Sequence, residues 1–111
     1  MGMYGEVLGI GPFRRELVPY LQQPDAWHEG THEGAVIVVP VFDAPEGSTR
    51  SQKLAHCMGA EAWDFNTHAI DPWHVDVEAV RLFLNPGEEH RLKCFLKLRD
   101  AGFAFFFRPN G

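Results

Sequence analysis

The sequence predicts an α+β fold, with a small mixed sheet of three to four strands and about four helices packed on it. Two runs have the β-branched or aromatic composition of strands, AVIVVPVF at residues 35–42 and FAFFF at residues 103–107. Between them, apolar residues recur every three or four positions, as on the buried face of a helix. The 111 residues suffice for one core, so a single globular domain is expected over residues 1–111.

Three strands are expected, at residues 3–10, 35–42 and 103–108. The first is a short apolar segment that closes on a Gly-x-Gly turn signal. Pro40 lies inside the second, and because proline donates no backbone hydrogen bond, this strand is expected to lie at an edge, a bulge or a strand end. The third places aromatic residues on both of its faces, so at least one face of the sheet must be covered.

The first two helices are expected on either side of the second strand. One follows Pro12, which suits the first turn of a helix, and Pro19 should kink or shorten it. The other runs over residues 48–58, with a serine or threonine as N-cap and Gly59 as its C-terminal stop.

The last two helices have the clearest boundary signals. Asp71 followed by a proline predicts a helix start, and apolar residues at helical spacing continue from there to Leu84. A further helix is expected over residues 85–101, because it begins with a sequence that resembles a capping box and ends at Gly102.

Charge is unevenly distributed along the chain, whose formal net charge is −5. From Pro24 to Val80 ten acidic residues stand against only Arg50 and Lys53, a formal charge of −8. This acidic stretch repels phosphate, so nucleic acid is a poor candidate partner, and a basic protein is the partner class that the charge favours. A homo-oligomer is left open.

The composition also bears on compartment and cofactors. No apolar run approaches the roughly 20 residues of a membrane helix, and no secretory signal is evident, so a cytoplasmic protein without membrane association is expected. Cys57 and Cys94 are expected to be free thiols facing the core from separate helices, which weighs against Cys57 as a nucleophile with His56 or His68 as its base. No cofactor is expected.

One formal motif occurs, HEGTH at residues 28–32, which matches the H-E-x-x-H pattern and resembles the zinc proteases. That resemblance implies that His28 and His32 bind zinc from one face of a helix while Glu29 activates water. Gly30 inside the segment and the strand that follows leave little room for a helix, so a loop without stoichiometric zinc is expected. Loop chelation of a transition metal is the other alternative.

A second group of polar residues lies in WDFNTHAIDPWHVD, residues 63–76. Its three aspartates and two histidines have the side chains of a metal site or an acid–base pair. Most have a structural explanation, since Asp71 suits a helix cap and the aromatic residues suit a packed corner. His68 is the residue that these explanations leave unassigned.

The size and acidity of the chain resemble those of the immunity or inhibitor proteins that bacteria keep against toxins. The leading hypothesis is therefore a non-enzymatic protein-binding domain. Its expected interface combines exposed aromatic and acidic residues, a composition typical of protein interfaces: Trp27, Asp25, Glu29, Trp63 and Trp73. The alternative is a small metal-dependent enzyme or metal-binding protein that uses His28, His32 or His68. A structural oligomer without a small ligand is third.

Overall fold

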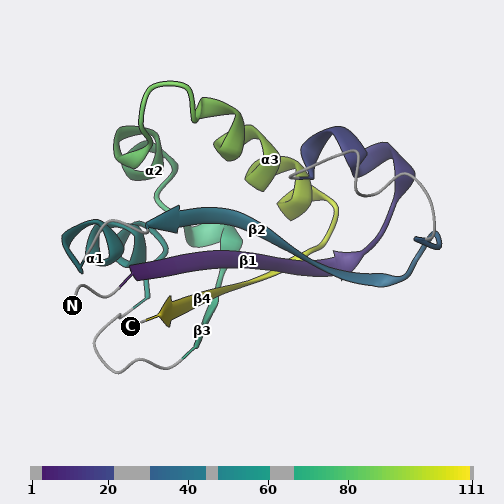
Figure 1. Ribbon diagram of the computed structural model, residues 1–111, viewed down its shortest axis with the longest axis horizontal. Helices are drawn as coiled ribbons and strands as arrows, with labels where there is room; N and C mark the ends of the chain where they lie inside the picture. Colours follow the sequence, from purple (N-terminus) through teal and green to yellow (C-terminus); the bar gives the residue numbers. More distant parts are fainter. Residues whose placement is uncertain (1–3, 22–30, 45–47, 61–66, 111) are drawn as a thin grey trace.

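Four strands form one sheet, and the helices pack on one side of it (Figure 1). The structure is a computed structural model and describes four ranges of the chain: residues 4–21, 31–44, 48–60 and 67–110. Its strands and helices confirm the α+β class and the presence of a fourth strand. Among the described residues, no helix is both long enough and apolar enough to cross a bilayer.

The strands are β1 (Tyr4–Pro12), β2 (Val36–Ala44), β3 (His68–Ile70) and β4 (Ala104–Asn110), and their order in the sheet is β2-β1-β4-β3. The three strands expected from sequence lie within two residues of their expected positions. All three pairings are antiparallel, so the expectation of a mixed sheet was wrong. β1 and β2 are consecutive strands that lie side by side, as is typical of antiparallel neighbours, whereas β4 returns from the far end of the sequence to pair antiparallel with both β1 and β3.

Pro40 lies both on an edge strand and at a β-bulge, two kinds of position that tolerate its missing N–H. β2 is the outermost strand of the sheet, and its register with β1 shifts at this proline, where Leu8 pairs with Pro40 and Val7 pairs with Phe42. Val41 is the extra residue of this bulge, and it is buried together with Phe42 although the two are adjacent in sequence. The expectation that Pro40 places this strand at an edge, a bulge or a strand end is confirmed, because the strand is at an edge and has a bulge.

The first two helices differ in type. The segment after Pro12 forms a 3₁₀-helix, η1 (Arg15–Tyr20), with Pro19 inside it, and the chain is extended again at Leu21. The expectation of a shortened helix is thus confirmed. α1 (Ser48–Cys57) follows β2 and agrees with the expected range to within a residue.

The helix expected to begin after Asp71 is in fact two helices. η3 (Pro72–His74) is a single 3₁₀ turn, and α2 (Val77–Phe83) begins after an extended residue. Each has its own aspartate cap: Asp71 accepts a hydrogen bond from the Trp73 N–H at 3.0 Å, and Asp76 accepts one from the Ala79 N–H at 3.1 Å. The second cap starts a new helix and ends the expected continuous one.

α3 (Glu89–Asp100) begins four residues later than expected. The residues before it form a turn in which the Glu88 carboxylate accepts a hydrogen bond from the Asn85 N–H at 2.9 Å. The helix ends as expected at Gly102, whose φ of +89° is the left-handed conformation that glycine adopts without strain.

The core lies between the helices and the inner face of the sheet, where buried hydrophobic side chains form one cluster. Phe95 of α3 lies at its centre, with ring centroids 5.5 Å from Phe42 and 4.7 Å from Phe105. β1 has glycines facing this side, and aromatic rings of the C-terminal segment pack directly over Gly9 and Gly11. Glycine is required at Gly11, because an added Cβ would lie 2.6 Å from the Phe103 ring.

Candidate interaction surface

The outer face of the sheet, opposite the helices, is apolar over most of its area. Residues that pair directly across antiparallel strands lie on the same face, so the register identifies which side chains share it. We call the following residues the outer face: Leu8, Ile10, Pro12, Val36, Val38, Pro40, Ala69, Ala104 and Phe106. All are exposed or half-buried, whereas most of their neighbours on the inner face are buried.

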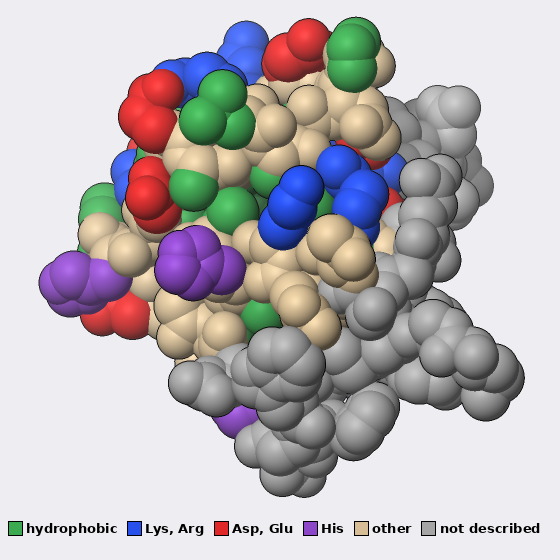
Figure 2. All heavy atoms as spheres, turned by 90° about the vertical axis from the view of Figure 1, so that its left-hand side faces the viewer, with side chains coloured by type: hydrophobic (Ala, Val, Ile, Leu, Met, Phe, Trp, Pro, Cys, Tyr) green, Lys and Arg blue, Asp and Glu red, His purple; other side chains and the backbone are tan. Residues whose placement is uncertain are grey.

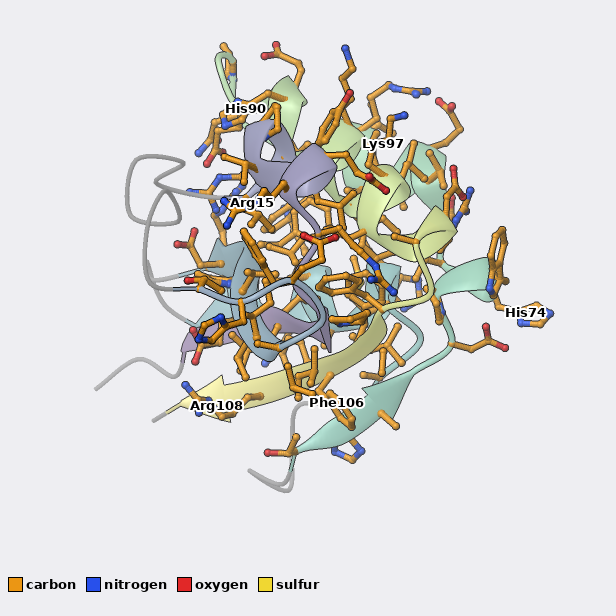
Figure 3. The ribbon with its side chains drawn as sticks, turned by 90° about the vertical axis from the view of Figure 1, so that its right-hand side faces the viewer. Arg15, His74, His90, Lys97, Phe106 and Arg108 are labelled. Atoms are coloured by element: carbon orange, nitrogen blue, oxygen red, sulfur yellow. The ribbon has the colours of Figure 1, made fainter. Side chains whose placement is uncertain are left out.

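The outer face is unusual for a sheet that has helices on one side only, because such a sheet normally carries polar residues on the other. The exposed fraction is 74% at Val36 and 52% at Val38. Phe106 points away from the helical side of the molecule, on which His90 and Lys97 lie (Figure 3). Strand spacing and rise give this apolar area as roughly 300 Å². Apolar patches of about 300–600 Å² are the largest on typical monomers and are often functional.

A row of charged residues borders the outer face at one end. Glu6 pairs with Arg108 across β1 and β4, and the Arg108 Nε donates a hydrogen bond to Glu6 Oε1 at 2.8 Å. On the other side of Glu6, Asp43 of β2 accepts a hydrogen bond from Arg91 of α3 at 3.1 Å. These carboxylates already have cationic partners within the chain, so covering the outer face would not leave them unpaired.

Trp73 is the one residue of the expected interface that the structure describes. Its side chain in η3 has an exposed fraction of 63%. Trp73 is therefore a surface residue, although its helical spacing with the apolar residues up to Leu84 had predicted a position on a buried helix face. The guanidinium of Arg99 lies 4.2 Å from the centroid of the indole ring, a cation–π contact that orients the ring. The other residues of that interface lie outside the described residues: Trp27, Asp25, Glu29 and Trp63.

The polar group at residues 63–76 has structural roles at the positions that are described. Asp71 and Asp76 are helix caps, and the His74 Nδ1 lies 2.5 Å from the Asp71 Oδ2. The hydrogen bond with His74, followed by the one from the Trp73 N–H, holds the pKa of Asp71 below its usual value. These interactions lie on the exposed surface, where they fix the turn that carries Trp73.

The three histidines considered as metal ligands are not shown to come together. His28 lies outside the described residues, His32 is exposed and not helical, and His68 is half-buried in β3 opposite Phe107. Next to His32, Glu33 accepts a hydrogen bond from the Arg15 N–H at 3.2 Å, so this acidic side chain supports the start of η1. Within the described ranges, no three His, Cys, Asp or Glu side chains are grouped as metal ligands.

The two cysteines are free thiols on different helices. Cys57 is buried, as expected, and burial followed by the negative charge of Asp76 raises the pKa of its thiol. Cys94 was expected in the core, but it is only half-buried because α3 turns it toward the edge of its buried face. Burial raises the pKa of Cys94 as well. Both thiols are therefore poor nucleophiles at neutral pH, because the thiolate is the reactive form.

The thiols should react slowly with a disulfide reagent at pH 7 while the protein is folded, Cys94 before the more deeply buried Cys57. After denaturation without reductant, both should react at once and give two equivalents. Absorbance of the released chromophore, followed in Cys57→Ala and Cys94→Ala variants, assigns each phase. Rapid reaction of Cys57 in the folded protein would instead indicate a thiolate, and with it a catalytic role.

Reasoning from the sequence missed the outer face, although a signal was present. In AVIVVPVF the residues at both odd and even positions are apolar, whereas a strand with one wet face alternates apolar and polar residues. The same holds for FAFFF, which had been taken to require a cover on at least one side. The structure shows the helices covering only one side of both strands.

Comparison with known proteins gives no match: no protein-family model, curated protein or solved structure is similar to the chain.

Proposed function

We propose that this protein is a non-enzymatic protein-binding domain and that a partner protein covers the outer face of its sheet. The observation that carries the proposal is the apolar outer face, with Val36 exposed to 74% and Val38 to 52%. Burying apolar area contributes roughly 25 cal/mol per Å², so a patch of this size can supply several kcal/mol to association. In size and acidity the protein resembles the immunity or inhibitor proteins, and a role of that kind is part of the proposal.

The chemistry of the expected partner follows from the charges around the outer face. Because Glu6 and Asp43 are already paired within the chain, the direct contact calls for an apolar surface on the partner. The net charge of −5 would attract a basic protein over longer distances and increase the rate of association. We therefore expect a partner with an apolar contact surface surrounded by basic residues.

Trp73 and the four residues outside the described ranges form a second part of the proposed interface. Tryptophan is enriched among the residues that dominate binding energy, and Trp73 is exposed while its contact with Arg99 orients the ring. Trp73 lies only three residues after Ile70, the last residue of β3. β3 also carries Ala69 of the outer face. A partner that contacts the end of β3 could therefore reach both.

The proposal can be tested by binding measurements on a purified pair. A partner would be identified by cross-linking and mass spectrometry, and its dissociation constant would then be measured by calorimetry. We expect Val38→Lys to weaken binding by about tenfold or more, because it places a charge in an apolar contact, a cost of about 1.4 kcal/mol or more. Since Val38 is on the surface, the variant should unfold at nearly the same denaturant concentration as the wild type.

Leu82→Lys is the matched control, because Leu82 is equally apolar and even more exposed but lies on α2, on the other side of the sheet. It should leave the dissociation constant unchanged, whereas raising the salt concentration should slow association of the wild type. Equal binding by the wild type and Val38→Lys would contradict the outer face as the interface. One equivalent of zinc in the purified protein, lost in His32→Ala, would favour the metal-dependent enzyme instead.

A further inference from the structure

A groove lies between α1 and α2, on a part of the molecule that the proposed interface does not use. Its volume is about 740 Å³, within the range of roughly 300–1,000 Å³ that is typical of small-molecule sites. Figure 2 looks onto the side of the molecule that carries these two helices, and Lys, Arg and His side chains gather near its centre. The two walls of the groove differ in chemistry.

The α1 wall is polar. Thr49, Gln52, Lys53 and His56 line the groove, and their spacing of three, four and seven residues places them on one stripe of the helix. Each of these side chains ends in a group that can donate a hydrogen bond. These four side chains span eight residues of α1, so this polar wall extends for about 12 Å.

The α2 wall is apolar. It consists of Ala79, Leu82 and Phe83, which also share one face of their helix. Leu82 has an exposed fraction of 87%, the highest among the large exposed hydrophobic side chains of the described residues. Phe83 also lines the groove, although its side chain is buried.

Arg50 holds the two walls together. Its guanidinium lies 4.0 Å from the centroid of the Phe83 ring, and its Nη1 donates a hydrogen bond to the Phe83 carbonyl at 3.1 Å. That carbonyl belongs to the last residue of α2, where helix carbonyls lack partners within the helix. The contact therefore fixes the end of α2 against α1.

Lys53 is the one Lys, Arg, Asp or Glu among the described residues that line the groove, whereas the chain as a whole has a formal net charge of −5. Lys53 has no carboxylate within ion-pair distance in the described part of the chain, whereas Arg81, Arg91 and Arg108 each have one. An exposed ammonium group beside an apolar wall complements an anion attached to an apolar body.

We propose that the groove between α1 and α2 binds an organic carboxylate with an aliphatic body, its carboxylate at Lys53 and His56 and its chain along Leu82 and Phe83. The apolar wall runs from Ala79 to Phe83, five residues that rise about 7.5 Å along α2, so a chain of medium length covers it. The ligand class is therefore a medium-chain carboxylate. This site is independent of the protein-binding role proposed above, because it uses neither the outer face nor Trp73.

Decanoate is the probe for this site, titrated into the full-length protein and followed by calorimetry and by amide chemical shifts. We expect saturable binding of one equivalent, with the shifts concentrated in α1 and α2. Lys53→Gln should weaken decanoate binding by about three- to tenfold, as expected for loss of an exposed charge-assisted hydrogen bond. Leu82→Ser should weaken it to a similar extent through loss of apolar contact.

Lys93→Gln is the matched control, because Lys93 is an exposed lysine of α3 and the substitution changes the net charge equally. It should leave decanoate affinity unchanged. Decyltrimethylammonium, which has the same chain and the opposite charge, should bind less tightly than decanoate. Equal binding of the two probes, shifts outside α1 and α2, or no saturable binding would each overturn the proposal. So would an acidic amphipathic peptide that occupies the groove when decanoate does not.

Discussion

Phe95→Ala is expected to lower the free energy of unfolding by about 3–5 kcal/mol, the range for removing a large aromatic side chain from a core. Phe95 has no exposed surface, and its ring contacts Phe42 of β2 and Phe105 of β4. It is thus the side chain through which α3 holds both of these strands. Urea denaturation followed by circular dichroism would measure the loss, which is a large fraction of the stability of a typical domain.

Leu96→Ala is the control for Phe95, since Leu96 is the next residue of α3 but is only half-buried. Its truncation leaves a space that water can enter, so we expect a loss of about 1 kcal/mol. Similar losses for the two variants would mean that α3 does not pack on the sheet through Phe95. A variant too unstable to purify can be replaced by Phe95→Leu, for which a smaller loss is expected.

Gly11→Ala is expected to destabilise the fold by about 1–3 kcal/mol through overpacking, although alanine suits a strand as well as glycine does. The added Cβ would lie 2.6 Å from two atoms of the buried Phe103 ring, closer than carbon atoms approach in folded proteins. The ring must therefore move, and with it the packing between β1 and the segment leading into β4. The midpoint of urea unfolding measures the effect.

Gly9→Ala is the same substitution two residues earlier, and it separates steric conflict from a general effect of alanine in β1. There the nearest atom to the added Cβ, in the Phe105 ring, lies at 3.1 Å, a distance that a small adjustment can relieve. We expect Gly9→Ala to change stability by less than about 1 kcal/mol. A greater loss at Gly9 than at Gly11 would contradict the packing of Phe103 over β1.

The sequence was sufficient to locate strands and helix ends where the determining residues are close in sequence. The β-branched and aromatic runs locate β2 and β4 to within two residues, and Gly102 marks the end of α3 through its own backbone conformation. The expected continuous helix after Asp71 was wrong because apolar residues at helical spacing occur on both sides of the break, although η3 buries none of its residues and Trp73 is exposed. The apolar spacing therefore continues through the break, and the Asp76 cap was the local signal that distinguished them.

The candidate surfaces were harder to predict because they depend on which elements meet. Nothing local to Val36 and Val38 indicates that the helices will pack on the other side of β2. The groove likewise requires α1 and α2 to lie side by side, an arrangement held by the contact between Arg50 and Phe83, 33 residues apart. Trp73 was identified as a candidate interface residue from its residue type; the structure shows that it is exposed, and its role in binding stays a prediction.

The bulge at Pro40 has a consequence for how this protein behaves at high concentration. An outermost strand with many apolar residues is a template on which strands of other molecules can add, the first step toward fibrils. In β2, Pro40 lacks the N–H that such an addition would need, and the shift of register around it bends the strand out of line with a straight neighbour. The protein can thus leave an apolar sheet face exposed while the β2 edge resists uncontrolled polymerisation.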